Sequence, residues 1–381
     1  MPLKATLLFA LLMVFTYAGY PLVAFLLARI AGRGVKRATY KPTVSVILPV
    51  HNEGDRLIQK VRNLREQTYA GDRVEIIVVD DGSTDGSAER LSLRDPLGVG
   101  VVLLPRRYGK ATAINAGLEA ATGQVIVFTD ARQTLEPKAI EMLLENLADP
   151  SVAAVTGRLA TMDRTADGVF RRYVERLRSW EALWGSCAGV TGALYAVRRK
   201  HATALPADTI LDDLVMSLGA ASRGRLVYDT RAVAIEEPQD YSGVWRRRLR
   251  TLAGNWQILL HPLTYSRIFS PRALVPLICQ KALRLFFPFF AAGFAISAAY
   301  WLPAAAVLAT AATAVLGMAV VAAFKRGLLG HAGQALASVF LAPVEALLLY
   351  LVGRETVLWA KSGGAVGAGT GRAGVTIPTF R

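Results

Sequence analysis

The sequence contains few of the residues that build metal centres and disulfide frameworks. Only two cysteines, Cys187 and Cys279, occur in 381 residues, and the four histidines are scattered without ligand spacing. This composition indicates neither a disulfide-stapled fold nor a structural zinc site. A GxGxxG turn is also missing after the first expected strand, where His51, Asn52 and Glu53 stand instead. Its absence argues against a dinucleotide-binding oxidoreductase.

Acidic residues are outnumbered by basic ones, 29 against 44, which gives a formal net charge of +15. A nucleic-acid binder could carry such a charge, but these basic residues lie beside apolar segments and not along an aromatic-rich RNA-binding motif. We therefore expect anionic membrane lipids and a diphosphate as partners, and no nucleic acid. Hydrophobic residues make up 53% of the chain and charged residues 19%. This mixture predicts one soluble domain together with membrane spans.

An uncharged segment at residues 5–28 is long enough to cross a hydrocarbon core of about 30 Å. A cleaved signal peptide would be shorter and would end at a small-residue cleavage site, which does not stand out here. Lys4 alone precedes the segment, whereas a basic cluster follows it at Arg29, Arg33, Lys36, Arg37 and Lys41. This asymmetry predicts that the soluble domain after the segment is cytoplasmic.

Apolar segments return beyond residue 270. Three are candidate spans, at residues 285–301, 303–324 and 335–353, while the basic residues in 271–284 favour an interfacial helix. The glycine-rich end predicts a flexible tail. The expected organisation is a membrane helix with its basic flank (1–41), a soluble domain (42–240), interfacial helices (241–284), about three spans (285–353) and a tail (354–381).

Strand-like apolar runs alternate with helical patterns in the soluble domain. Four runs suit strands that are buried on both faces, namely residues 44–49, 74–79, 99–104 and 124–129. In the helix expected at 54–67, Leu57, Val61 and Leu64 share one stripe. This alternation predicts an α/β fold with a mostly parallel sheet and right-handed crossovers.

Polar motifs follow several of these strands and continue beyond them. In chain order they are VSVILPVHNE (44–53), VVDDGSTD (78–85), GKATAIN (109–115), TDARQ (129–133), LDDL (211–214) and RRLRTLAGNWQ (247–257). With these motifs the chain resembles, from about residue 44 to 256, the membrane-bound family 2 glycosyltransferases, which include cellulose, hyaluronan and poly-N-acetylglucosamine synthases. The resemblance implies a GT-A-like nucleotide-sugar domain flanked by transmembrane helices. It also implies inverting transfer from a UDP-sugar.

The resemblance assigns Pro49, Asn52, Glu53 and Asp81 to the donor, because the family binds the nucleoside with these two strand ends. A carboxylate can accept hydrogen bonds from ribose hydroxyls or from the imide N–H of uracil. The alternative is that the second motif only forms a turn and caps a helix, and Asp80 is expected to be its structural member.

Lys110 stands at an expected helix start, where its cation and the free backbone N–H groups would meet anionic oxygen of the donor. Without the GKATAIN motif around it, the residue would be an ordinary surface lysine.

The TDARQ motif departs from the family's Asp-x-Asp, since Arg132 stands at the second aspartate position. Asp130 is the expected ligand of Mg²⁺ or Mn²⁺, which would bridge the diphosphate, and Arg132 is expected to contact phosphate directly. Loss of metal dependence is a second interpretation. Helix capping by Asp130 near Glu136 is a third.

The LDDL motif matches a Glu-Asp pair of the family, so the resemblance implies Asp213 as the base that deprotonates the acceptor hydroxyl. Asp212 and Asp213 also suit a helix N-terminus as an acidic pair. In the last motif, Arg250 aligns with the arginine of the synthases' Gln-x-x-Arg-Trp and is expected to contact the diphosphate. Arg247 and Thr251 replace the glutamine and the tryptophan.

The missing tryptophan argues against long-chain processivity, because in the family it stacks on the acceptor sugar. Trp256 is a candidate substitute, whereas Trp180 and Trp184, four residues apart on an expected helix, suit core or interfacial anchors. We expect a lipid-linked or growing polysaccharide acceptor. A processive synthase with its own channel is one alternative, and a nucleotide-sensing transport or scaffold protein is another.

Overall fold

The computed structural model describes residues 2–69, 71–87, 91, 99–161, 166–236, 241–266, 271–300, 303 and 327–353. Within them an eight-stranded sheet has the order β3-β2-β1-β4-β7-β6-β8-β5. The strands are β1 (Val44–Val50), β2 (Val74–Asp80), β3 (Gly100–Leu103), β4 (Val125–Thr129), β5 (Gln133–Leu135), β6 (Val152–Thr161), β7 (Leu194–Arg198) and β8 (Arg225–Glu236). Only β5 and β7 run antiparallel to their neighbours, which confirms the predicted α/β fold with a mostly parallel sheet.

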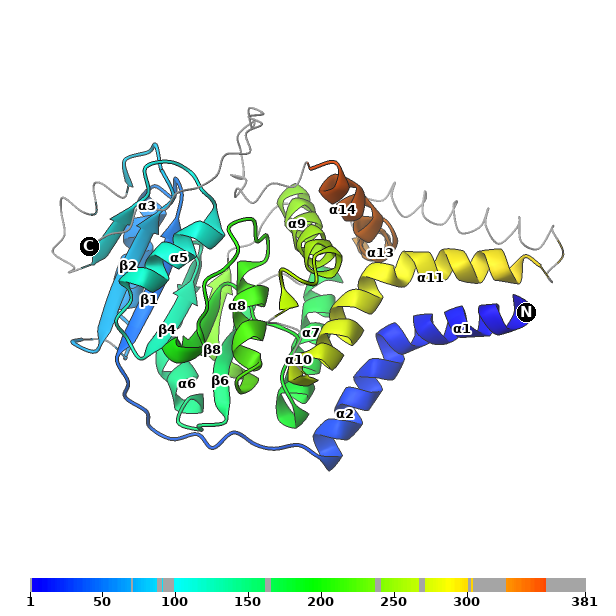
Figure 1. Cartoon of the computed structure of the whole chain (residues 1–381), viewed down its shortest axis with the longest axis horizontal. Coiled ribbons are helices and arrows are strands. Elements are labelled where there is room, and N and C mark those ends of the chain that lie inside the picture. The colour runs from blue at the N-terminus through cyan, green and yellow to red at the C-terminus, as the bar shows by residue number, and fades with distance from the viewer. Residues whose placement is uncertain are drawn as a thin grey trace.

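Helices cover the sheet and extend from one end of it (Figure 1). Those of the soluble domain are α3 (Asp55–Arg65), α5 (Lys110–Ala120), α6 (Ala139–Asn146), α7 (Ala166–Trp184), the 3₁₀ turn η2 (Arg199–His201) and α8 (Asp212–Ala221). The helix α9 (Tyr241–Leu260) follows the domain and packs against the C-terminal helices. The N-terminal segment comprises α1 (Pro2–Val14), the π-helical η1 (Phe15–Gly19) and α2 (Tyr20–Ile30). The C-terminal part comprises α10 (Pro271–Pro276), the π-helical η4 (Leu277–Ala282), α11 (Leu283–Ala298), α13 (Gly327–Phe340) and α14 (Ala342–Leu351).

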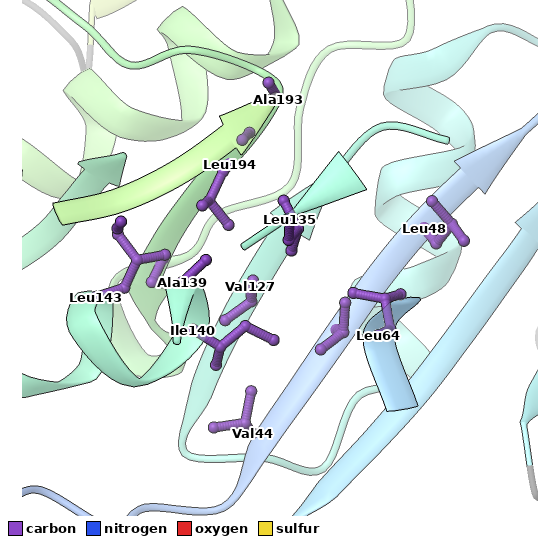
Figure 2. Packing of buried hydrophobic residues seen from close by; sticks show 14 of the residues in the cluster. Val44, Leu48, Leu64, Val127, Leu135, Ala139, Ile140, Leu143, Ala193 and Leu194 are labelled. Atoms are coloured by element: carbon purple, nitrogen blue, oxygen red, sulfur yellow. The ribbon is translucent and has the colours of Figure 1, made fainter. Parts of the chain in front are cut away.

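Alternate residues of the central strands supply two hydrophobic cores on opposite faces of the sheet. In β1, Leu48 packs with α3 and α6, and Figure 2 shows Leu64 and Ile140 of those helices in this core. Ile47, the preceding residue, packs with α5 and α8 on the other face. Successive side chains of a strand point to opposite faces, so a strand buried on both faces needs an unbroken apolar run.

Two helical segments of the described chain are long and apolar enough to cross a membrane, Pro2–Ile30 and Ala273–Ala298. They lie side by side, with α1 packed along α11 (Figure 1). The second segment joins the expected interfacial helix to the expected span after it, because the helical backbone continues through η4. The expected span at 303–324, apart from Pro303, and the tail at 354–381 lie outside the described residues.

Contacts with the soluble domain hold the N-terminal helix in place. The backbone N–H of Arg33 donates to Leu183 O at 2.7 Å, and Arg37 Nε donates to Asn146 Oδ1 at 3.0 Å. The ring of Trp180 on α7 meets Phe25 of α2 edge-on at 5.3 Å. Trp180 thus packs between α7 and the N-terminal segment.

Candidate active site

The carboxyl ends of β1, β2 and β4 meet at one edge of the sheet. Pro49 of β1 is in register with Val79 of β2, and Ile47 is in register with Phe128 of β4. The loops after these strands therefore lie next to one another, as expected for the ligand-binding edge of a parallel sheet. They carry the first, second and fourth motifs of the sequence.

The first two loops are bonded directly to each other. Asn52 has a left-handed backbone with φ of 53°, which asparagine tolerates better than most residues. In this position its backbone N–H donates to Ser83 Oγ at 2.8 Å, and its Oδ1 accepts from Thr84 N at 2.7 Å. The structure thus brings the expected donor residues of β1 and β2 together.

The carboxylates of Asp80 and Asp81 accept hydrogen bonds from different loops. Asp80 closes its own turn by accepting from Ser83 N at 3.0 Å, which confirms its structural assignment. Asp81 is fully buried and accepts backbone hydrogen bonds from Tyr108 at 2.7 Å and Gly109 at 2.9 Å. Asp81 therefore fixes the loop that leads into α5.

Lys110 joins two motifs that are about a hundred residues apart. Its Nζ lies 2.8 Å from Asp130 Oδ1 and 3.2 Å from Asp212 Oδ2, and the lysine side chain is 14% exposed. Burial acts to lower the pKa of Lys110, but the charges of Asp130 and Asp212 outweigh it and raise the pKa above its usual value. Lys110 is therefore a fixed cation beside the acidic residues of the site.

Asp213 lies next to this ion-paired group. Burial and the neighbouring Asp212 raise the pKa of Asp213, while Lys110 and Lys281 oppose the shift. A β-carbon added to Gly192 would lie 3.3 Å from Asp213 Oδ2 and 3.7 Å from Asp130 Oδ2, so both carboxylates border the same glycine. A carboxylate with a raised pKa suits proton abstraction.

The fit of a divalent ion to the site depends on Asp130. Among the described residues, no group of three or more His, Cys, Asp or Glu side chains could hold a metal ion. Asp130 is 34% exposed, and one of its oxygens is paired with Lys110. Mg²⁺ is commonly held by one or two carboxylates together with substrate phosphates. Asp130 therefore fits as a single protein ligand, provided that a diphosphate supplies further oxygens.

Three arginines supply positive charge around these carboxylates. Arg132 Nε lies 3.6 Å from Glu53 Oε1, which joins the first and fourth motifs. Arg250 Nη2 donates to Ile210 O at 3.4 Å, but its buried Nε has no partner among the described residues. Arg107 Nε and Nη2 are likewise buried without a partner in the described chain. Donors of this kind suit an anionic ligand.

The sequence did not single out Arg107, although two adjacent arginines shortly before a helix start were a possible signal. Burial lowers the pKa of Arg107, Asp81 opposes this shift, and the charge of Arg250 adds to it. Arg107 and Arg250 are therefore close enough to repel each other. An anion between them would relieve the repulsion.

Tyr195 on β7 is a second residue that sequence reasoning missed. Its hydroxyl is buried with no partner in the described part of the chain. Burial raises its pKa well above the usual value, and the charges of Asp212, Asp213 and Asp130 add to the effect. Its ring stacks on Phe128 at 4.6 Å. No motif marks this tyrosine, which reaches the site because β7 pairs with β4.

Trp256 is not placed to stack on an acceptor sugar, so the suggested substitution for the missing tryptophan is wrong. Its side chain is 3% exposed, and its indole N–H donates to Pro343 O at 2.9 Å. The ring meets Phe286 and Phe289 of α11 edge-on. Trp256 is therefore buried against the C-terminal helices and presents no ring face to a sugar.

Family models match most of the soluble domain and continue into the C-terminal helices. The model described as Glycosyl transferase family 2 matches residues 45–201. The model described as Glycosyl transferase family group 2 matches residues 125–325, which is more than half of the chain.

Curated relatives are similar over part of their length. The probable glycosyltransferase YdaM of Bacillus subtilis (strain 168) is 29% identical over 241 residues, which cover 58% of this chain and 56% of that protein. The poly-beta-1,6-N-acetyl-D-glucosamine synthase of Staphylococcus aureus is 24% identical, covering 57% and 55%. An undecaprenyl-phosphate 4-deoxy-4-formamido-L-arabinose transferase of Klebsiella pneumoniae is 32% identical, covering 43% and 51%. The chain thus spans about half the length of the curated relatives it matches.

A solved structure is similar over almost the whole chain. The mannosyltransferase PcManGT from Pyrobaculum calidifontis, in complex with GDP-Man and Mn²⁺, has a TM-score of 0.72 and 25% sequence identity. The match covers 93% of this chain and 100% of that chain. This similarity confirms the predicted GT-A-like fold.

Proposed function

This chain belongs to the family 2 glycosyltransferases, and from that membership we propose that it transfers a sugar from a UDP-sugar to a lipid-linked or growing polysaccharide acceptor, with inversion. The observation that carries the proposal is the meeting of Lys110, Asp130 and the Asp212–Asp213 pair at the ligand-binding edge of the sheet. Basic side chains that can bind a diphosphate lie there beside a carboxylate whose pKa is raised. The named activities of the relatives support this class of reaction.

The proposed reaction needs a base and a stabilised leaving group. Asp213 takes the proton of the acceptor hydroxyl, whose oxygen attacks the anomeric carbon from the face opposite the diphosphate. The bond between that carbon and the diphosphate oxygen breaks, and the nucleoside diphosphate departs. Lys110, Arg107 and Arg250 stabilise its developing negative charge.

The donor ligands proposed for this reaction are those expected from the motifs. Pro49, Asn52, Glu53 and Asp81 bind the nucleoside, and Arg132 and Arg250 contact the diphosphate. Asp130 would hold Mg²⁺ or Mn²⁺, and the ion would add charge neutralisation at the diphosphate. The Mn²⁺ in the mannosyltransferase complex supports the use of a divalent ion.

The membrane arrangement is part of the proposal. The two long apolar helices, Pro2–Ile30 and Ala273–Ala298, cross the membrane. The catalytic domain, residues 42–240, lies on the cytoplasmic face of the bacterial inner membrane, where nucleotide sugars are made. Both helices adjoin the catalytic domain in the fold (Figure 1), so a lipid acceptor could reach the site from the bilayer.

A donor screen tests the proposal. Purified protein in lipid is supplied with UDP- and GDP-sugars, and released nucleoside diphosphate is detected. Release from a UDP-sugar is expected. Preference for a GDP-sugar would overturn the proposal of a UDP-sugar donor. Nucleotide binding without release of nucleoside diphosphate would favour the nucleotide-sensing alternative. Excess chelator should stop the reaction, and full activity in its presence would remove the metal from the mechanism.

The base is tested by Asp213→Asn, which keeps the shape of the side chain but removes the proton acceptor. Turnover should fall by about 100-fold or more while donor binding is retained. The matched control is Asp208→Asn, because Asp208 is an exposed aspartate near the same helix. Near wild-type turnover by Asp213→Asn would contradict the assignment of Asp213 as the base.

A further inference from the structure

Three basic residues converge where α7 meets the C-terminal membrane segment. Arg178 lies on α7, Lys281 on η4 and Arg284 on α11, and the charges of both arginines act on Lys281. We call these three residues the basic cluster. The guanidinium of Arg284 also lies 5.8, 5.3 and 5.4 Å from the ring centroids of Tyr17, Phe170 and Tyr173.

The basic cluster has no acidic partner in the described chain. No carboxylate there lies within 4.0 Å of its nitrogen atoms. Arg178 Nε and two guanidinium nitrogens of Arg284 are buried and donate no hydrogen bond to described residues, so the aromatic rings are the contacts that Arg284 has in their place. Buried cationic donors without an acceptor are costly. An anion from outside the protein would remove this cost.

The charge of Glu181 acts on all three residues of the basic cluster, but its carboxylate is already hydrogen-bonded to neutral donors. Its carboxylate accepts hydrogen bonds from Tyr20 Oη at 2.5 Å and from Ala188 N at 3.0 Å, and Gln280 Nε2 adds a third at 3.3 Å. Burial raises the pKa of Glu181 to about 7. Near neutral pH it therefore supplies only part of one negative charge.

The basic cluster borders the proposed active site. Arg178 Nη2 donates to Val190 O at 3.4 Å, and Gly192, two residues later, borders both Asp213 and Asp130. Lys281 acts electrostatically on Asp213 from η4, yet the two groups are not within ion-pair distance. Single π-helical turns inside α-helices are frequent at functional sites. This one lies within the segment Ala273–Ala298 and carries Lys281, whose charge acts on Asp213.

We propose that the basic cluster binds the phosphate of a lipid-carried acceptor, so that the acceptor is a sugar joined to a lipid through phosphate and not a neutral glycan. The inference rests on the proposed function, because the sugar hydroxyl of that acceptor faces Asp213. The apolar helices that carry Lys281 and Arg284 offer a surface for the lipid chain. A phosphate oxygen is already ionised near neutral pH, so the presence of a base favours a hydroxyl nucleophile.

A binding experiment tests this without turnover. Full-length protein in phosphatidylcholine nanodiscs is titrated with a short prenyl phosphate and with the matching prenyl alcohol. Lys281→Gln and Arg178→Gln should each weaken prenyl phosphate binding by about tenfold or more. The matched control is Arg176→Gln, since Arg176 is an exposed arginine two residues away on α7. The proposal is overturned when all three variants bind prenyl phosphate like the wild type.

Two further arms separate the sources of phosphate. Nanodiscs containing phosphatidylglycerol, and added inorganic phosphate, should leave prenyl phosphate binding nearly unchanged. If either competes as well as prenyl phosphate itself, the basic cluster is a general headgroup or free-phosphate site and the proposal fails.

A transfer assay distinguishes failure of the inference from failure of the proposed function. It compares a prenyl-diphosphate-linked sugar with an alkyl glycoside of the same sugar, and the phosphate-linked acceptor should have the higher kcat/KM. Equal values would overturn the inference but keep the glycosyltransferase. If no nucleoside diphosphate is released with any donor or acceptor, the proposed function fails, and the binding experiment still decides the phosphate site.

Discussion

Replacing Lys110 with methionine should move the pH dependence of transfer. Methionine keeps an unbranched apolar stem but removes the ammonium that lies 2.8 Å from Asp130 and 3.2 Å from Asp212. The same ammonium opposes the raised pKa of Asp213, which results first from burial and then from Asp212. Without Lys110 the pKa of Asp213 should rise further, because only Lys281 and the hydrogen bond from the Leu214 backbone N–H are left to oppose the shift.

The expected change in the pKa of Asp213 follows from general magnitudes for interacting charges. Two unit charges 4 Å apart interact by about 4 kcal/mol at an effective dielectric constant of 20, and a nearby opposite charge moves a carboxyl pKa by about 1 to 3 units. Lys110 pairs directly with Asp130 and Asp212 and not with Asp213, so we take the lower end, about one unit. A base works in its ionised form, so activity rises as pH increases through its pKa. The acid limb of kcat/KM should therefore move to higher pH by about one unit.

The assay measures nucleoside diphosphate release between about pH 5 and pH 9, with Lys138→Met as the matched control because Lys138 is exposed. Binding of the nucleoside diphosphate is titrated separately and should also weaken in Lys110→Met, since a cation is lost. An unmoved acid limb together with weakened binding would refute the electrostatic coupling of Lys110 to Asp213. Lys110 would then bind the diphosphate without affecting the pKa of Asp213.

Three further predictions concern the phosphate contact, a buried acid and the topology. Arg132→Ala should weaken UDP binding more than uridine binding, because guanidinium pairs with phosphate oxygens; equal losses would mean that Arg132 only supports Glu53. Glu181 has its pKa raised from 4.5 to about 7 by burial, so the wild type should lose roughly 3 kcal/mol of stability as pH rises from about 4.5 through 7. Glu181→Gln should flatten this dependence of Tm on pH, and parallel curves for both proteins would contradict it. A reporter fused within residues 140–150 should be cytoplasmic, and periplasmic labelling would overturn the orientation.

The sequence by itself determined four of the eight strands of the sheet, and it predicted that the donor binds at their carboxyl ends. The runs expected at 44–49 and 74–79 are β1 and β2, because a strand buried on both faces must be apolar throughout. Asp81 and Asp130 could be placed together, since the carboxyl ends of parallel strands share one edge. Lys110 could be placed at a helix start, where it lies. Each of these inferences needs only local periodicity and a rule of topology.

Tertiary structure alone decided which of these groups touch. The ion pairs of Lys110 with Asp130 and Asp212 depend on α5 and α8 packing on the same face of the sheet. Tyr195 reaches the carboxylates only because β7 inserts antiparallel between β4 and β6. Trp256 packs against α11 and α14, and Lys281 acts on Asp213 from the long apolar helix Ala273–Ala298. The periodicity of a sequence reports which face of a helix or strand is buried, but it does not report which distant segment packs against that face. The free energy that selects the partner arises only when the packed surfaces meet.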